Sequence, residues 1–464
     1  MKAIEVAVAG NPAPGIAQAG AAMADAMGDC AESQTIHVSK VFAVGVGNAL
    51  EFYDFLTFSF FAIQIGHCFF PATQKSHSLL YSLAAFGVGF LMRPIGSIVI
   101  GSYGDRVGRK PAMILSFSLM GAAILGLALT PGYARIGIAA PILLVIFRLT
   151  QGFALGGEVG PSTAFLVEAA PPSRRGFYVS VQYMTQDMAI LLAGIVGFLL
   201  SRWLSPQAID TWGWRVAFLL GTAVVPVGLY MRHGLPETMG EEDRRAARAA
   251  KHHVPVRIVL LGLMMLLSGT VFLYGLDYIT TYVQDILHLS VGIAFAATVV
   301  VGFSAMVFDP LTGLLSDLLG RKPVMLTATV ALLLLTVPLY MAMNRFHSVA
   351  VMLGAMAVLA VLEALFSGPA LVTITESLPK AVRSGVLAVI YAVSISVFGG
   401  TTQFAVKFLT DLTHSPLATA WYMTGALIIG LIAMVLVEET APVKAAAKNP
   451  LPADKRQATF DGLQ

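Results

Sequence analysis

Two carboxylic acids and an amide recur along one face of a short apolar stretch near the start of the chain. In "GNALEFYDF", Asn48, Glu51, Asp54 and Phe55 follow the spacing that brings side chains together on a helix. A face with two carboxyls suits a water-lined cavity in which one of them binds and releases a proton. We predict that Asp54 and Glu51 bind protons or a ligand, and that Asn48 contacts that ligand. In the alternative interpretation, Glu51 only pairs with a base on a neighbouring helix.

Arginines stand inside two later apolar stretches. Arg93 in "FLMRPIGS" lies near the middle of its stretch, where its guanidinium could bind a carboxylate through two parallel hydrogen bonds. The alternative is an ion pair between Arg93 and Glu51 or Asp54, with which a bound anion could compete.

The second of these stretches, "FRLTQGFALGGEVG", places Arg148, Gln151 and Glu158 on one side of a helix. We predict that Arg148 pairs with the acids of "GNALEFYDF", that Gln151 lies near a ligand, and that Glu158 is a further proton-binding acid. The glycines of this stretch let a neighbouring helix approach closely.

Hydroxyl and amide groups from later stretches could line the same cavity. Tyr274 and Tyr278 fall at helical spacing in "SGTVFLYGLDYITTYVQD", and their hydroxyls could bind carboxylate or hydroxyl groups of a ligand. Tyr183, Gln186 and Gln403 are further candidates. For the residues of the second half, Tyr274, Tyr278 and Gln403, packing between helices is an equally good interpretation.

Four acids in apolar stretches keep open roles: Asp187, Asp277, Asp309 and Glu363. The three aspartates could titrate, or could favour a ligand with some cationic character. Asp309 precedes Pro310, so this position could instead mark a helix break. We expect Glu376 to pair with basic loops, and Lys407 to extend outward to a membrane surface.

The composition requires a membrane environment for these stretches. Apolar residues make up 57% of the chain and charged residues only 12%, whereas soluble domains have about 25% charged residues. Apolar runs of about 20 residues recur, each long enough to cross a hydrocarbon core of about 30 Å. We predict an all-α polytopic membrane protein with twelve transmembrane helices in two six-helix halves. The spans are 41–66, 79–103, 111–131, 138–168, 176–201, 214–232, 257–285, 291–316, 323–343, 348–377, 384–410 and 416–437.

The polar segments between the spans give the domain boundaries and the orientation. Residues 1–37 form an N-terminal tail, 38–232 the first bundle, 233–256 a linker, 257–437 the second bundle and 438–464 a C-terminal tail. Lys and Arg concentrate in alternate loops, which places these loops, the linker and both termini in the cytoplasm. An ion pair or hydrogen bond inside the bilayer is needed for each charge that remains within a span, because its insertion costs about 2.5–3.5 kcal/mol.

A charged decapeptide occurs twice, at equivalent places in the two halves: "GSYGDRVGRK" at 101–110 and "GLLSDLLGRK" at 313–322. The repeat indicates halves related by an axis along the membrane normal, as in transporters. We predict a conformational latch, in which glycines permit close approach, the acid accepts from backbone N–H groups and the bases pair across the halves. The residues are Gly101, Asp105, Arg106, Gly108, Arg109, Lys110, Gly313, Asp317, Gly320, Arg321 and Lys322. Leu318 replaces Arg106 in the second copy, so the two copies need not act equally. The alternative is that the bases only fix the orientation.

The decapeptide resembles the signature loop of the major facilitator superfamily, and this resemblance covers residues 38–437. "GNALEFYDF", "GFLMRPIGS", "RLTQGFALGGEVG" and "RRGFYVSVQYMTQ" are similar to the metabolite:proton symporters, which carry citrate, 2-oxoglutarate, shikimate, or proline and betaine. The resemblance implies a bacterial inner-membrane protein that takes up a metabolite together with protons.

We therefore expect a secondary transporter that takes up a small organic acid, citrate-like or a dicarboxylate, with protons by alternating access. The alternatives are a symporter for a zwitterionic osmolyte such as proline or betaine, or for a shikimate-like metabolite, and a sensor that kept the fold without moving solute. Sodium could replace the proton. No nucleophile–base pair or metal-ligand spacing indicates an enzyme, and no cofactor or nucleic-acid partner is implied. We expect a monomer in the lipid bilayer.

Overall fold

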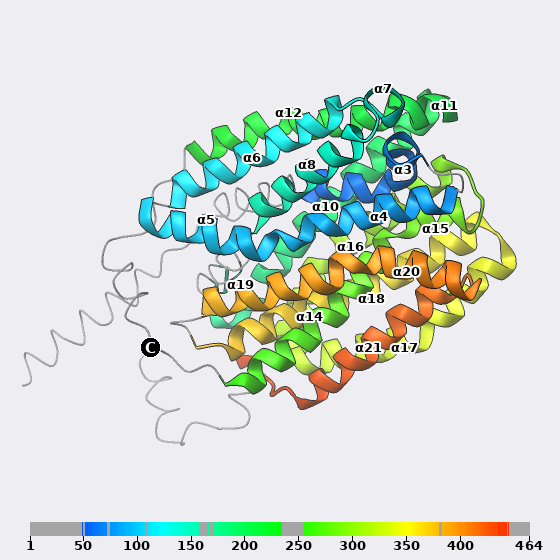
Figure 1. The fold of residues 1–464 in the computed structure, drawn as a ribbon. Helices are drawn as coiled ribbons and strands as arrows, with labels where there is room; N and C mark the ends of the chain where they lie inside the picture. Colours follow the sequence, from blue (N-terminus) through cyan, green and yellow to red (C-terminus); the bar gives the residue numbers. More distant parts are fainter. Residues whose placement is uncertain are drawn as a thin grey trace, which may run out of the picture. The chain divides into compact units, whose positions relative to one another are not determined.

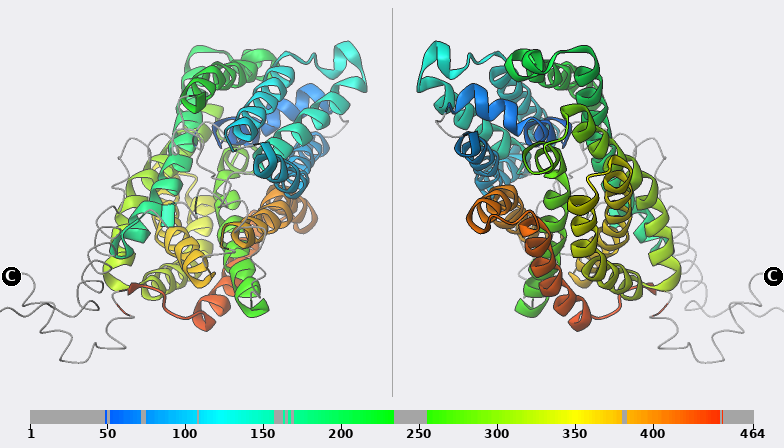
Figure 2. Two further views of the ribbon diagram at one scale, coloured as in Figure 1. Left: turned by 90° about the vertical axis from the view of Figure 1, so that its left-hand side faces the viewer. Right: turned by 90° about the vertical axis from the view of Figure 1, so that its right-hand side faces the viewer.

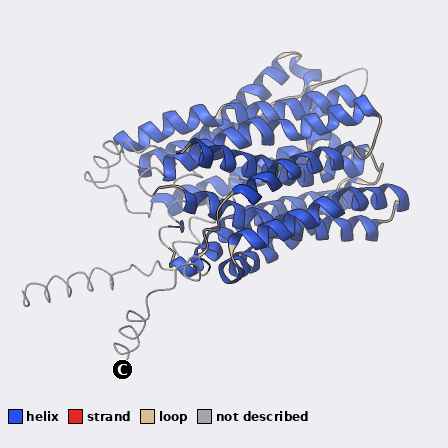
Figure 3. Cartoon of the chain, turned by 90° about the horizontal axis from the view of Figure 1, so that it is seen from below, coloured by secondary structure: helices blue, strands red, loops and turns tan. Residues whose placement is uncertain are grey.

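The computed structural model describes residues 49, 52–71, 75–107, 109–156, 163, 166–167, 170–233, 255–379, 383–442 and 444. These residues form helices and short connections, with no strand among them (Figure 3). The two predicted tails lie outside the described residues, apart from a few positions after 437, as do most of the linker, Asn48, Glu51, Gly108 and Glu158.

The helices of the first half follow the predicted order (Figure 1). A helical segment at 52–60 precedes α3 (Ala62–Phe69), α4 (Lys75–Leu91), α5 (Arg93–Val107), α6 (Arg109–Leu129), α8 (Ala139–Leu155), α10 (Arg175–Trp203) and α12 (Trp214–His233). Short pieces connect them: α7 (Tyr133–Ile136), η1 (Pro172–Arg174), α11 (Pro206–Ala208) and the π-helical η2 (Ile209–Gly213).

The second half repeats this order after the linker. Its helices are α14 (Val256–Asp277), α15 (Ile279–Asp285), α16 (Val291–Leu319), α17 (Arg321–Phe346), α18 (Val349–Ser377), α19 (Arg383–Ser394), the π-helical η3 (Ile395–Gly399), α20 (Gly400–Thr413) and α21 (Ala418–Leu436). Figure 2 shows the helices of the two halves in two groups.

The lengths and composition of these helices confirm the predicted fold class. Within the described residues, eight helical stretches are long and apolar enough to cross a membrane, and the shorter apolar helices Ile114–Leu129 and Ala139–Leu155 fall at two more predicted spans. The segment 52–69 and α12 occupy the first and sixth predicted positions.

Several predicted spans depart locally from regular α-helix where polar groups gather. The second span does so at Met92, directly before Arg93, and the seventh at Tyr278, while helical hydrogen bonds continue across both positions. The eleventh span contains η3, a π-helical turn of the kind often found at functional sites. In contrast, α16 runs unbroken through Pro310, so the predicted alternative of a break at Asp309 is wrong.

Helices α10 and α16 join the two halves at very close range. A Cβ added to Gly302 of α16 would lie 3.0 Å from the carbonyl oxygen of Asp187, and one added to Gly194 of α10 would lie 3.0 Å from the amide of Val299. Small residues permit such approach between membrane helices, where van der Waals packing drives association. This contact makes the α10–α16 pair the principal junction between the halves.

Close packing inside the first half depends on Gly152 of α8. A Cβ at this position would overlap the carbonyl oxygen of Gly89 on α4. We predict that Gly152→Ala destabilises the fold by about 1–3 kcal/mol, because the backbones must separate. The thermal unfolding midpoint of the purified protein measures this effect. Gly425→Ala is the matched control, since Gly425 is an exposed helical glycine with nothing near its Cβ position. Equal midpoints for the two variants would contradict this packing account.

Candidate functional site

A hydrogen-bonded line connects an acid to an arginine inside the first half. Gln151 donates from Nε2 to Asp54 Oδ2 over 2.6 Å, and Arg148 donates from Nη1 to Gln151 Oε1 over 2.8 Å. All three side chains are at least 98% buried. The predicted association of Arg148 with Asp54 is therefore present, but it runs through Gln151 and is no direct ion pair. Asp54 Oδ1 keeps no hydrogen-bond partner among the described residues.

Aromatic rings surround the two guanidinium groups. The Cζ atom of Arg148 lies 4.3 Å from the ring centre of Phe58 and 4.8 Å from that of Phe55. The Cζ atom of Arg93 lies 4.6 Å from the ring centre of Phe55 and 4.5 Å from that of Phe90. Cation–π attraction of this kind contributes about 2 kcal/mol in desolvated sites. This attraction partly offsets the free-energy cost of burying the two positive charges.

Arg93 borders a cavity and has no acidic partner within the described part of the chain. Its side chain is 6% exposed, and no ion pair joins it to Asp54. Leu155, Gly156 and Tyr391 line the same space, which we name the arginine cavity. The guanidinium is thus placed as a free cationic group between α5, α8 and α19.

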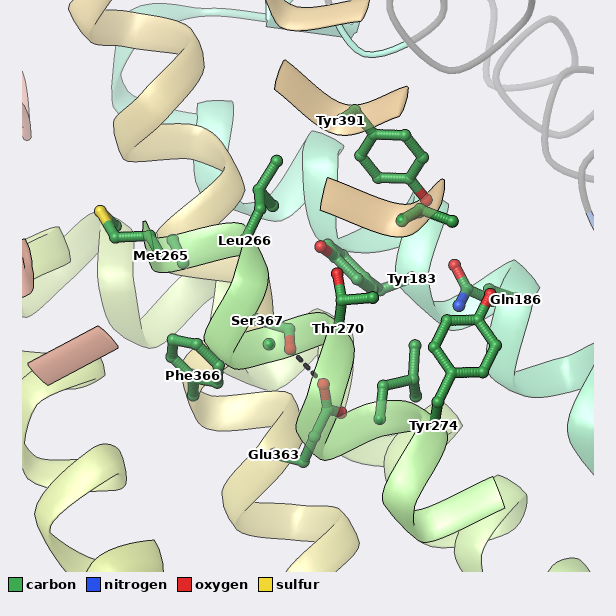
Figure 4. Close-up of a pocket in the computed structure, with 14 residues that line it drawn as sticks. Tyr183, Gln186, Met265, Leu266, Thr270, Tyr274, Glu363, Phe366, Ser367 and Tyr391 are labelled. Atoms are coloured by element: carbon green, nitrogen blue, oxygen red, sulfur yellow. Dashed lines mark hydrogen bonds between the residues drawn. The ribbon is translucent and has the colours of Figure 1, made fainter. Parts of the chain in front are cut away.

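A second space, which we name the tyrosine cavity, adjoins the first. The two cavities share Tyr391 and Ile395 as lining residues. The predicted contacts Tyr183, Gln186 and Tyr274 all border the tyrosine cavity (Figure 4). Its remaining polar lining comes from residues that sequence reasoning did not select as ligand contacts: Thr270, Glu363, Ser367 and Tyr391. Tyr391 is a single tyrosine in an apolar run, so no spacing pattern marked it.

Two of the predicted contacts lie outside both cavities. Tyr278 is completely buried at the turn between α14 and α15. Gln403 hydrogen-bonds with Ser59, which places its amide in a contact between α20 and the first half. Gln403 also donates to the backbone carbonyl of Tyr274, a lining residue of the tyrosine cavity.

The second copy of the decapeptide forms the predicted backbone contact. Asp317 accepts hydrogen bonds from the backbone N–H groups of Gly176 and Phe177, both over 2.9 Å. It also pairs with the fully buried Arg321. Because Gly176 and Phe177 begin α10, the acid Asp317 ties the second half to the first.

The bases of this second copy pair within their own half, whereas pairing across the halves was predicted for Arg106, Arg109 and Lys110 of the first copy. Arg321 pairs with Asp317 and with Glu376, which belong to its own half, and Lys322 donates to the carbonyl oxygens of Val435 and Val437. The crossing ion pair comes from outside the decapeptide: Arg175 of α10 lies 3.7 Å from Glu376. Glu376 thus has the basic partners expected of it.

The glycines of the two copies also differ. Gly313 meets the backbone of Gly176 closely, as predicted, and Gly320 takes a φ of +104° that favours glycine. Gly101 of the first copy is exposed and has no atom within 4 Å of its Cβ position, so the predicted close approach is wrong there. The charged side chains of the first copy, on Asp105, Arg106, Arg109 and Lys110, lie outside the described part.

The expectation for Lys407 is wrong. Its side chain is 5% exposed and pairs with Asp285 over 2.8 Å and with Asp411 over 2.7 Å. Ser76 of α4 donates to the same Asp411, which joins α20 to the first half. The two nearby acids make burial of the lysine preferable to extension along the membrane surface.

We predict that Asp317→Ala lowers the unfolding midpoint strongly, because it leaves the charge of Arg321 underpartnered and two N–H groups without an acceptor. Breaking a buried pair in this way typically costs about 3–5 kcal/mol. Glu438→Gln changes an exposed carboxyl at the end of the same half and is the control. A midpoint for Asp317→Ala within error of the control would show that this junction contributes little.

Comparisons with known proteins agree with this architecture. The family model described as Major Facilitator Superfamily matches residues 55–401. A citrate-proton symporter of Klebsiella pneumoniae is 36% identical over 408 residues, covering 85% of this chain and 90% of that protein. The glycine betaine/proline/ectoine/pipecolic acid transporter OusA of Dickeya dadantii is 31% identical over 435 residues, covering 90% and 86%. The fold matches the xylose transporter XylE from E. coli with a TM-score of 0.71 at 18% identity, over 86% of this chain and 97% of that one. The chain belongs to the major facilitator superfamily and, within it, to the metabolite:proton symporters.

Proposed function

We propose that this symporter carries a small organic acid, a citrate-like tricarboxylate or a dicarboxylate, into the bacterial cell together with protons. The single observation that carries the proposal is Arg93, a buried guanidinium that borders a cavity and has no acidic partner in the described part of the chain. Transport would proceed by alternating access in the inner membrane, with a monomeric chain and both termini in the cytoplasm.

The charge balance around the cavity favours an anion. Arg93 brings a positive charge to the lining of the arginine cavity, and Arg148 lies behind that lining, against the same Phe55 ring. Asp54 reaches Arg148 only through Gln151, and Glu363 is the acid on the lining of the adjoining tyrosine cavity. Burial of an uncompensated charge is unfavourable, and π faces offset it only in part. A carboxylate bound to Arg93 through two hydrogen bonds would complete the compensation.

The adjoining tyrosine cavity supplies groups for further oxygens of a polycarboxylate. Tyr183, Thr270, Tyr274 and Tyr391 carry hydroxyls, and Gln186 carries an amide. A few placed polar groups in a mostly apolar pocket are typical of sites for small molecules. An acid with one carboxylate at Arg93 could therefore extend a second carboxylate or a hydroxyl toward these side chains.

Asp54 is the group best placed to couple proton movement to this anion. One of its oxygens accepts from Gln151 and the other has no partner within the described residues. Protonation of Asp54 would remove the one negative charge of this hydrogen-bonded line, so that the region around Arg148 and Arg93 would become more positive and bind a substrate anion more strongly. Glu51 and Glu158 stay proposed as additional proton-binding acids.

The alternative substrate is a zwitterion such as proline or betaine, supported by the similarity to OusA and by the buried acids of the second half. A zwitterion would need an acidic or aromatic partner for its cation as well as a base for its carboxylate. A shikimate-like acid would also fit Arg93. Binding of a substrate without its uptake would indicate the remote alternative, a sensor. Uptake that depends on a sodium gradient would show that sodium, in place of the proton, is the coupling ion.

We predict that Arg93→Lys raises the KM for the transported acid at least about tenfold, because lysine keeps the charge but loses the two-pronged bond, worth about 1.5–3 kcal/mol. Uptake of labelled citrate, 2-oxoglutarate, shikimate and betaine into energised vesicles measures this change. Arg345→Lys is the control, since Arg345 is exposed at the end of α17. If the vesicles take up betaine but none of the acids, and Arg93→Lys does not change that uptake, the substrate is a zwitterion and the anion proposal is wrong.

We predict that Asp54→Asn abolishes uphill accumulation while exchange of internal for external substrate continues. The amide still accepts a hydrogen bond from Gln151 but cannot carry a proton. Accumulation and exchange are measured with the same labelled substrate in vesicles with and without a pH gradient. Asp210→Asn, which alters a partly exposed acid beside His67, is the control. Full accumulation by Asp54→Asn would transfer the coupling role to another acid.

A further inference from the structure

Four carboxyls gather where α10 of the first half packs against α16 and α18 of the second, and one of them, Asp277, belongs to α14. Asp187, Asp277, Asp309 and Glu363 are each at least 97% buried. No ion pair joins any of them to a Lys or Arg in the described ranges. The site described above has no use for most of these acids, although four buried carboxyls without a base are costly in a membrane.

The contacts of this carboxyl cluster are specific. The side chains of Asp187 and Asp309 lie within hydrogen-bonding reach of each other. Glu363 lies near both aspartates. It also accepts a hydrogen bond from Ser367, which Figure 4 shows. Asp277 faces Asp187 and Glu363, and neither of its oxygens has a partner among the described residues.

Three tyrosines lie near this cluster among the described residues. Tyr183 of α10 lies near Asp187, Asp309 and Glu363, Tyr274 of α14 lies near Asp277, and Tyr391 of α19 lies near both tyrosines. Arg93 and Arg148 are the bases near Tyr274. With Ser367, the three hydroxyls are the polar groups placed to share protons with the cluster. The unpartnered carboxyl of Asp277 gives a second, independent sign that the cluster holds an exchangeable ligand.

A hydrogen bond between two carboxyls exists only while one of them carries a proton. If both were ionised, two negative charges would repel strongly in a low-dielectric interior. Asp187 belongs to the first half and Asp309 to the second, so the shared proton joins the halves. The two helices also approach closely two turns before Asp309, since a Cβ added to Gly302 of α16 would lie 3.0 Å from the carbonyl oxygen of Asp187.

We propose that Asp187 and Asp309 form a proton-binding site, distinct from Asp54, whose occupancy holds the two halves together along α10 and α16. Release of the proton leaves two like charges across the junction and favours its separation. Asp277 and Glu363 would receive the proton within the cluster. A proton fits better than a metal ion, since no group of three His, Cys, Asp or Glu in the described residues is arranged to hold one.

The inference deepens the proposed proton coupling, and its test needs no substrate. The unfolding midpoint of purified protein is measured against pH for the wild type, Asp187→Asn and Asp309→Asn. An asparagine at either position donates a hydrogen bond to the remaining carboxylate without a titrating proton. We expect the wild-type midpoint to fall as pH rises, and both variants to lose this fall. Glu438→Gln, an exposed carboxyl outside the cluster, should keep the wild-type dependence.

Infrared spectroscopy provides the second readout and covers the case in which a variant does not fold. The wild type should show a protonated-carboxyl band that disappears with rising pH, and whichever aspartate variant folds should lack that component. A wild-type pH dependence in both variants, or a wild type without any such band, would overturn the inference. If vesicles take up the organic acid but the wild-type unfolding midpoint does not change with pH, only the proposed proton site at the junction is contradicted. If the midpoint changes with pH as expected but no organic acid is taken up, only the proposed substrate is contradicted.

Discussion

A charge inside the hydrocarbon layer persists only when another group compensates it, and this constraint organises the polar interior of the protein. Arg321 is completely buried and has Asp317 and Glu376 as partners. Lys407 has Asp285 and Asp411. In both places the base has two acidic partners, and both places contact the other half, through Gly176 or through Ser76. These ion-paired groups lie at contacts between the bundles.

Charges without full compensation stand between these contacts. Arg93 has aromatic rings and a cavity beside it in place of an ion-pair partner. Asp54 and Arg148 are linked only through the side-chain amide of Gln151. The carboxyl cluster around Asp187 lacks a base in the described part. A transporter needs groups of this kind, because an uncompensated charge attracts an anion or a proton more strongly than an ion pair does. Charges with ion-pair partners therefore serve the structure, and charges without them are available for transport.

Much of the fold followed from the sequence because a bilayer demands long apolar helices, and the length of each run is visible in the chain. The decapeptide that occurs twice indicated the two halves, because a repeat is also visible in the chain itself. The local departures from regular α-helix at Met92, Tyr278 and η3 were not visible, because they depend on which helix packs opposite. Gly101 and Gly313 illustrate the limit: they are equivalent in sequence, yet only Gly313 meets another backbone. Lys407 was misplaced although its partner Asp411, four residues later, is visible in the sequence, and its second partner Asp285 lies far away in the chain. Tyr391 was missed because a single tyrosine carries no pattern.

The most direct test of the central account is the external pH of a lightly buffered suspension of proteoliposomes that contain the purified protein. Addition of the transported organic acid at neutral pH should make the medium more alkaline, as protons enter with the anion, and an uncoupler should abolish the change. Entry of the labelled acid without any movement of protons would contradict proton coupling. An alkaline shift on addition of betaine alone would contradict the anion site at Arg93.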